Sequence, residues 1–198
     1  PCSQTQTRRS TPASPLPALP FRPEESFMTD AFSPPFSALD NPRLEFVMEV
    51  RLSFPRVQMI ENTRWGGNRG AVYVESGTFE GPRLRGKAVP GSGGDYAYFR
   101  PDDVAVFDAR YMLEEEDGTL ILLNNKGFLW GRKPDTMERI RDWAFRGGHP
   151  VEHEEYYLRG QPSFETPVGK HDWLTKHVFV GVGERLVSGN VLRYYALT

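Results

Sequence analysis

Residues 77–127 read GTFEGPRLRGKAVPGSGGDYAYFRPDDVAVFDARYMLEEEDGTLILLNNKG, and this stretch decides the fold class. Apolar and polar residues alternate along most of it, as they do in strands with one buried face. Turn-forming residues separate the runs at Gly81-Pro82, at residues 90–94, at Pro101-Asp102 and at Asp117-Gly118. The last pair is typical of a tight hairpin. The stretch therefore predicts a meander of short antiparallel strands.

Further alternating runs lie on both sides of this stretch. LEFVMEVRLSF at residues 44–54 ends at Pro55, and EEYYLRG, KHVFVGVGERL and NVLRYYALT begin at residues 154, 176 and 190. The count comes to nine or so short strands. It favours a closed antiparallel barrel over an open sheet, because closure leaves no unpaired strand edge.

One helix is expected to interrupt the strands. Asp135 can cap its first turn, and Glu138 completes a capping-box pattern. Met137, Ile140 and Ala144 form an apolar stripe, and glycines at 147 and 148 end the helix. We therefore predict a mainly β fold: a single antiparallel closed β-barrel with one inserted short α-helix.

Proline and glycine divide the chain into two parts. Nine of the 17 prolines fall within residues 1–42, whereas all 19 glycines follow Trp65. A segment rich in Pro, Ser and Thr buries too little apolar surface to fold, so residues 1–42 are expected to be a disordered leader and residues 43–198 the barrel domain. Met28 opens a more ordinary start. Residues 1–27 are interpreted either as a non-native leader or as a targeting or partner-binding tail.

Composition excludes several classes of protein. The 198 residues suit one domain, and 24 basic against 26 acidic residues give a net charge of −2, which argues against a nucleic-acid partner. The single cysteine, Cys2, allows neither an intrachain disulfide nor a thiolate metal cluster, so the cytoplasm is the default location. No apolar run is long enough to span a bilayer, and no membrane partner is expected.

In a small barrel, the polar side chains that face the lumen are the candidates for chemistry. Along VAVFDARYML, Asp108 and Arg110 share one face and Tyr111 lies on the other. A lumenal Asp108 could act as an acid or base, but an outward ion pair with Arg110 fits the same pattern. If the other face is inward, Tyr111 takes the place of Asp108 in the site.

Four more candidates lie at loops and strand ends. Asp95 follows a glycine loop and could bring a carboxylate to the barrel mouth, although it could equally be a turn acid. Arg100 could bind a substrate anion or be a solvated rim residue, and Asn125 could orient a carbonyl or cap a turn. Tyr157 alternates with Tyr156, so one of the two faces inward, where its hydroxyl could donate a proton or simply pack.

No metal site or activated nucleophile is predicted. His149 and His153 are four residues apart, but Pro150 argues against the helix that would bring them together. His171 and His177 form no HExxH pattern, and no GxSxG elbow occurs in the chain.

The chain resembles the DUF3237 family, also called UPF0311, whose fold is similar to the barrels of allene oxide cyclases and dirigent proteins. The resemblance runs from about residue 44 to the C-terminus and rests on GTFEGPRLRGKAVPGSGGDY, RPDDVAVFDARYMLEEEDGTLI, NNKG, EEYYLRGQPSFET and WLTKHVFVGVGER. Asp103 stands where glycine is expected, Lys126 where arginine is common and Thr175 where asparagine is common.

The resemblance implies a calycin-like or allene oxide cyclase-like barrel with its site in the lumen. Glu165 in SFET and Trp173 in DWLTKH match motif positions. The first could be an acid or base and the second a stacking wall for a substrate ring, or both could cap and pack. Similar barrels also lead us to expect a homodimer, since such barrels often bury an outer sheet face by self-association.

We expect a cofactor-free lyase, isomerase or cyclase that uses acid–base chemistry on a small hydrophobic or aromatic metabolite in the lumen. Asp108, Tyr157 and Asp95 are the catalytic candidates, and the substrate-binding candidates are Arg100, Tyr111, Asn125, Glu165 and Trp173. One alternative is a carrier that binds such a molecule without converting it. Another is an interaction protein whose barrel is filled.

Overall fold

The computed structural model describes residues 41–187 and 189–198, which belong to one compact unit. The leader expected over residues 1–42 lies outside the described residues except for its last two positions. No described helix has the length and apolar character needed to cross a membrane.

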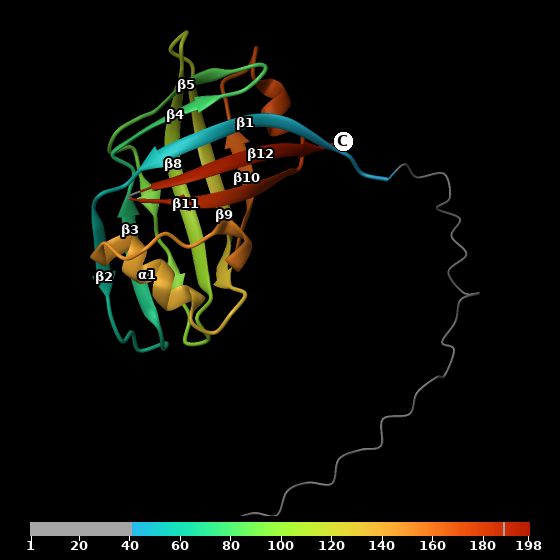
Figure 1. The fold of residues 1–198 in the computed structure, drawn as a ribbon. Helices are drawn as coiled ribbons and strands as arrows, with labels where there is room; N and C mark the ends of the chain where they lie inside the picture. The colour runs from blue at the N-terminus through green and yellow to red at the C-terminus, as the bar shows by residue number, and fades with distance from the viewer. Residues whose placement is uncertain (1–40, 188) are drawn as a thin grey trace, which may run out of the picture. The chain divides into compact units, whose positions relative to one another are not determined.

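Eight strands form a closed antiparallel ring, which confirms the predicted barrel (Figure 1). Around the ring the order is β8-β5-β4-β1-β12-β11-β10-β9, and pairing of β9 with β8 closes it. The ring strands are β1 (Leu44–Ser53), β4 (Ser76–Glu80), β5 (Arg85–Ala88), β8 (Ala105–Glu115), β9 (Leu120–Gly131), β10 (Tyr156–Glu165), β11 (Phe179–Leu186) and β12 (Gly189–Leu197). Their backbone groups pair within the ring, so the barrel has few open edges.

Four short strands extend the sheet at one end of the barrel. They are β2 (Val57–Ile60), β3 (Asn68–Tyr73), β6 (Gly94–Asp95) and β7 (Tyr98–Phe99). The second half of β8 pairs with β5, whereas its first half pairs with β6 and β7, which carry β3 and β2. The alternating sequence GAVYVESGTFEG at residues 70–81 reads as one strand but contributes to two, β3 and β4, because the chain leaves one part of the sheet at residues 74–75 and enters another.

The predicted helix is present as α1 (Thr136–Arg146) and ends at Gly147 in the left-handed conformation, with φ of 73°. The predicted capping box is wrong. Asp135 has helical rather than extended backbone angles, so its side chain makes no capping hydrogen bond, and its carboxylate lies 3.7 Å from the Arg139 guanidinium instead. Two 3₁₀ turns, η1 (His153–Glu155) and η2 (Asp172–Thr175), complete the elements.

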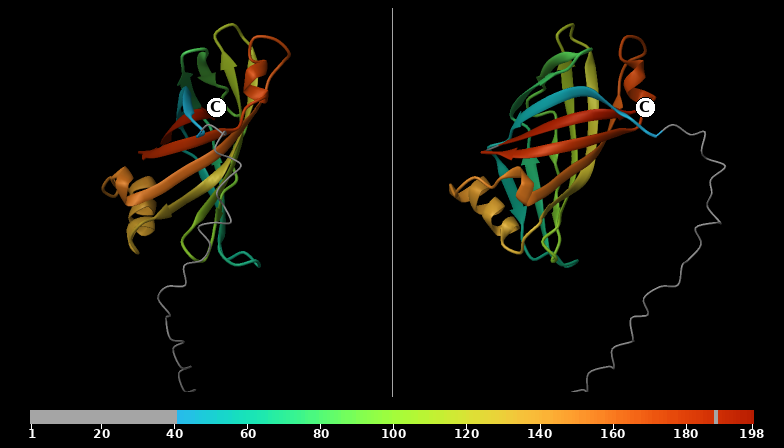
Figure 2. Two further views of the ribbon diagram at one scale, coloured as in Figure 1. Left: turned by 90° about the vertical axis from the view of Figure 1, so that its right-hand side faces the viewer. Right: turned by 45° about the vertical axis from the view of Figure 1, so that its right-hand side comes forward.

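Two apolar clusters divide the interior. The larger one fills the ring of strands, and its fully buried members are Met48, Val50, Leu113, Ile121, Leu123 and Tyr194. The smaller one lies where α1 packs against the strands, and it includes Ala105, Phe107, Met137, Ile140, Trp143 and Leu158. Figure 2 shows α1 outside the ring, at the end where β2 and β3 extend. The helix therefore closes one end of the barrel.

Candidate active site under helix α1

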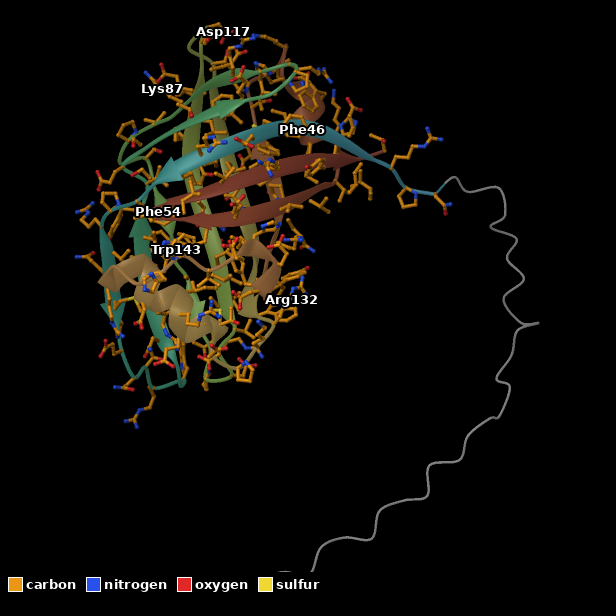
Figure 3. The ribbon with its side chains drawn as sticks, viewed as in Figure 1. Phe46, Phe54, Lys87, Asp117, Arg132 and Trp143 are labelled. Atoms are coloured by element: carbon orange, nitrogen blue, oxygen red, sulfur yellow. The ribbon has the colours of Figure 1, made fainter. Side chains whose placement is uncertain are left out.

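A cavity of about 110 Å³ lies between the filled part of the barrel and α1. Because roughly 10–15 Å³ of such space holds one water molecule, the cavity has room for a small organic molecule. Its wall is mostly aliphatic and aromatic, with Leu52 and Leu192 on the side of the larger cluster and Met137 and Ile140 on the helix. The polar residues of the wall are Asp95, Tyr111, Asn125, Arg141, Arg185 and Asn190. Figure 3 labels Phe54, which lines this cavity, and Trp143 on α1.

Asp95 brings a carboxyl group into this wall. It pairs in the sheet with Ala109, another cavity residue, and its Oδ1 accepts a hydrogen bond of 2.8 Å from the backbone N–H of Asp108. The pKa of Asp95 is raised from 3.8 to about 7, mainly by burial; the Asp108 N–H and Arg185 oppose this rise, and the charge of Asp108 adds to it. Both protonation states of Asp95 are therefore populated near neutral pH.

Arg185 is a cavity residue that the sequence reasoning missed. Its Nη1 donates a hydrogen bond of 3.1 Å to Oδ1 of Asn190, and its guanidinium carbon lies 5.0 Å from the ring centre of Phe54 and 5.9 Å from that of Phe145. Burial lowers the pKa of Arg185 to about 10. No carboxylate of the described residues forms an ion pair with it.

The alternation of β11 contains the signal that could have identified Arg185. Phe179, Gly181, Gly183 and Arg185 occupy the buried face of this strand. A Cβ on Gly183 would come within 2.5 Å of the Leu158 side chain, so glycine there makes room for a core residue of β10. An arginine that continues a face of aromatic and glycine residues is expected to point inward.

Tyr111 and Asn125 add polar groups that have unused hydrogen-bonding capacity. Asn125 donates from Nδ2 to the Tyr194 hydroxyl over 3.1 Å, but its Oδ1 and the Tyr111 hydroxyl have no hydrogen-bond partner among the described residues. Burial raises the pKa of Tyr111 well above its ordinary value, so its phenol is neutral. A Cβ on Gly160 would lie 2.3 Å from Asn125 Oδ1, so the neighbouring strand is shaped around this amide.

The structure brings Asp95, Tyr111 and Asn125 together at the cavity, but it places Asp108 on the outer face. Ala109 and Tyr111 line the cavity, so Asp108 between them points away. Its carboxylate lies 3.2 Å from Lys126 Nζ and 3.9 Å from Arg110 Nε, and its side chain is 40% exposed. The lumenal interpretation of Asp108 is therefore corrected, because the register of β8 turns Tyr111 inward in its place.

Tyr157 also faces outward, where its ring stacks on Trp130 with 5.3 Å between centres. The inward member of the pair is Tyr156, which is 2% exposed and accepts a hydrogen bond of 2.8 Å from the backbone N–H of Arg185. A proton donor at Tyr157 could not reach a ligand in the cavity.

The other three candidates are also absent from the cavity wall. Arg100 is exposed and pairs with Asp102, and Glu165 is exposed at the end of β10. Trp173 lies on η2, packs against the larger cluster and is covered by the Arg83 guanidinium at 4.0 Å from its ring centre. Arg100 is thus a solvated charge at the rim, Glu165 is an exposed residue at a strand end, and Trp173 is a packing residue.

A cluster of possible metal ligands lies at the opposite end of the barrel. Oxygen and nitrogen atoms of Glu115, Asp117 and His171 lie within 4.8 Å of one another. The Lys170 ammonium already donates to both Glu115 oxygens at 2.7 Å and to Asp117 at 3.1 Å. A positively charged group of the chain thus occupies the place where a cation would bind.

The backbone conformation of Asp103 is unfavourable for a residue that has a side chain. It has a φ of 61°, in the left-handed region where glycine is favoured, and it stands where the resemblance predicts glycine. Its carboxylate accepts a hydrogen bond of 3.1 Å from Arg141, which lines the cavity. The residue that replaces glycine therefore positions a cavity side chain.

Comparisons with known proteins agree with this fold. A UPF0311 protein of Clostridium acetobutylicum is 31% identical over 154 residues, covering 78% of this chain and 93% of that protein. A crystal structure of a beta-barrel like protein from Acinetobacter baumannii has a TM-score of 0.68 and 29% identity, covering 80% of this chain and 98% of that one. A structure described as an enzyme from Penicillium herquei has a TM-score of 0.57 at 18% identity and covers 79% and 95%, a likeness of fold alone. The model of the family described as "Protein of unknown function (DUF3237)" matches residues 42–197, and the chain therefore belongs to this family.

Proposed function

We propose that this protein is a cofactor-free lyase, isomerase or cyclase that moves a proton with Asp95 on a small, largely apolar molecule in the cavity under α1. The observation that carries the proposal is the position of Asp95, a carboxyl group in an apolar wall whose pKa burial raises to about 7. A group with a pKa near the working pH is well suited to act as a general acid or base.

The neighbouring side chains supply the rest of the chemistry. Tyr111 and Asn125 line the same cavity, and we assign the Tyr111 hydroxyl, beside that of Tyr194, and the Asn125 amide to the polar atoms of the ligand. The apolar wall excludes water and strengthens both interactions. Proton transfer and polarisation of an oxygen are therefore available from the chain itself, which is why the proposal needs no cofactor.

The fold is compatible with a catalytic role. The Penicillium herquei neighbour is described as an enzyme, and its barrel has the same architecture at low identity. A fold can host unrelated functions, so this likeness raises the expectation of catalysis but assigns no reaction.

The second candidate is a carrier that holds the same class of molecule unchanged. The enclosed, mostly apolar wall under α1 favours it, because such a wall binds by burial alone. A carrier does not need a buried ionisable carboxyl group, which lowers stability. Dependence of the activity on Asp95 would therefore distinguish an enzyme from a carrier.

The test is to incubate the purified protein with extracts rich in aromatic and unsaturated metabolites and to follow bound and converted species by mass spectrometry. Asp95→Asn removes the proposed acid–base group, and Asp108→Asn is the matched control on the outer face. We expect Asp108→Asn to convert substrate like the wild type and Asp95→Asn to be slower by about 100-fold or more.

Equal conversion by the two variants would contradict the role of Asp95. Stoichiometric retention of one unchanged compound by all three proteins would instead establish the carrier. Self-association into a homodimer stays a prediction, which the mass of the native protein in solution would test.

A further inference from the structure

Arg185 is a buried cation that the barrel leaves without a charged partner. Only 9% of the residue is exposed, and its Nε is buried with no hydrogen-bond partner among the described residues. Its one described side-chain hydrogen bond runs from Nη1 to Asn190. Neighbouring atoms of the protein cover Nε, and Nη2, which makes no hydrogen bond with the described residues, is the guanidinium nitrogen left for a ligand.

A guanidinium nitrogen of this kind is a strong donor to a carboxylate. A hydrogen bond between two charged groups is roughly twice as strong as one between neutral groups. The face of the guanidinium is occupied differently, since the rings of Phe54 and Phe145 lie 5.0 and 5.9 Å away. Aromatic rings compensate part of a buried positive charge but accept no in-plane hydrogen bond.

Asp95 does not supply the missing anion. Its charge and that of Arg185 influence each other's pKa, but the structure contains no ion pair between them. Burial also keeps Asp95 partly protonated near pH 7. The polar part of the cavity wall therefore has a positive charge that is only partly balanced.

We infer that the ligand of this cavity is a small organic acid whose carboxylate accepts a hydrogen bond from Nη2 of Arg185 while its apolar part lies against the wall beneath α1. The inference rests on the proposed function and narrows its substrate class. A cavity of about 110 Å³ suits an acid with a single ring or a short chain. The acid's carboxylate at Arg185 orients the rest of the molecule within the same cavity as Asp95.

The test compares two probes of nearly the same shape, 3-phenylpropanoate and 3-phenylpropanamide, by isothermal titration calorimetry at pH 7. The wild type is expected to bind the carboxylate at least tenfold more tightly than the amide. Arg185→Met keeps the aliphatic stem and removes the charge, and it should abolish this preference. Arg110→Met is the matched control, because it removes an arginine charge on the outer face of β8, away from the cavity, and it should keep the preference.

Equal affinity for the two probes, an unchanged preference in Arg185→Met, or no binding of either probe at millimolar concentration would each overturn the inference. The wild-type preference decides the matter even if Arg185→Met fails to fold. If the extract experiment shows conversion that depends on Asp95 but the two probes bind equally, the inference is wrong and the proposed function stands. Preference for the carboxylate without any Asp95-dependent conversion would leave a carrier of organic acids.

A second readout separates ligand binding from a structural role of Arg185. Met in place of an unpaired buried cation should raise the urea midpoint of the ligand-free protein, since the charge is costly to bury without a partner. A lower midpoint would assign Arg185 to the stability of the barrel and would count against the inference.

Discussion

The two ends of the barrel differ in whether their buried charged side chains have charged partners. At the end away from α1, Glu115 is 6% exposed, both its oxygens accept from Lys170 at 2.7 Å, and His171 Nε2 lies 3.4 Å away. At the end closed by α1, Arg185 is similarly buried but has no carboxylate partner among the described residues, and Asp95 has its pKa raised by burial. A buried charge with a partner in the chain costs less stability than one without, so the proposed ligand would act at the end with the greater cost.

We also expect the two ends to differ in how tightly they are packed. Substitutions that test this packing should have the largest effect on stability. Leu113 is fully buried in the larger cluster, so Leu113→Ala should cost about 3–5 kcal/mol of unfolding free energy through the cavity that it leaves. Leu129 already borders the cavity, so Leu129→Ala should cost about 1–2 kcal/mol. Urea denaturation of both variants measures the difference. Equal losses would mean that the helix-covered end is as tightly packed as the ring.

The pH dependence of stability should reveal Asp95. The unfolded chain loses this proton near pH 3.8 and the folded chain near pH 7, so between these values the folded state holds a proton that the unfolded state has released. Wild-type stability from this group therefore falls as pH rises from 4 to 7 and stays reduced above 7. Asp95→Asn does not titrate, and it should be more stable than the wild type by about 2–4 kcal/mol at pH 8 and by little at pH 4.

The groups around Asp95 are Asp108 and Tyr111 on β8 and Arg185 on β11, and they remain in the variant, so the difference between the two proteins isolates Asp95. Chemical denaturation at several pH values measures it. Asp108→Asn, on the outer face, should lack most of this pH-dependent gain. A constant difference between Asp95→Asn and wild type from pH 4 to 8 would show that Asp95 has an ordinary pKa.

Most strands of the barrel could be predicted from the sequence, but only half of the polar residues of the cavity wall could. Alternation and turn residues located the ring strands because each strand has one buried face. Alternation alone could not say which face of β8 is buried, and so Asp108 and Tyr111 were equal candidates until the pairing of β8 with β9 and β6 was known. Arg185 was missed for a related reason, since its inward direction depends on the glycines that precede it on β11.

The position of α1 could not be predicted from its stripe of apolar residues. The stripe shows that one face is buried but not against which strands. The closure of the barrel end by α1, together with the separation of β3 from β4, forms the cavity, and both depend on contacts between residues that are far apart in the sequence.

At the end of the barrel where Glu115 is paired, removal of its partner should lower the urea midpoint, whereas Arg185→Met should raise it. Lys170→Met leaves the buried Glu115 carboxylate without its ammonium donor and close to the Asp117 carboxylate, so the urea midpoint should fall, by less than in Leu113→Ala because Lys170 itself is half exposed. Glu114 and Lys87 form a pair at 3.5 Å on the same end with both side chains more exposed, and Lys87→Met is the control with little expected effect. Similar falls for Lys170→Met and Arg185→Met would erase the contrast between the two ends.

The smallest effect on stability is expected at Tyr111, and it gives the sharpest distinction between a group that supports the fold and one that awaits a ligand. The Tyr111 hydroxyl has no hydrogen-bond partner among the described residues, so Tyr111→Phe should change the unfolding free energy by less than about 1 kcal/mol, in either direction. Tyr194→Phe removes the acceptor of the Asn125 amide and should destabilise by about 1 kcal/mol. The order should reverse in the conversion assay, where Tyr111→Phe loses a donor to the ligand oxygen. If Tyr111→Phe is instead the more destabilising change, its hydroxyl belongs to the internal network of the barrel, and the polar wall of the cavity is reduced to Asp95, Asn125 and Arg185.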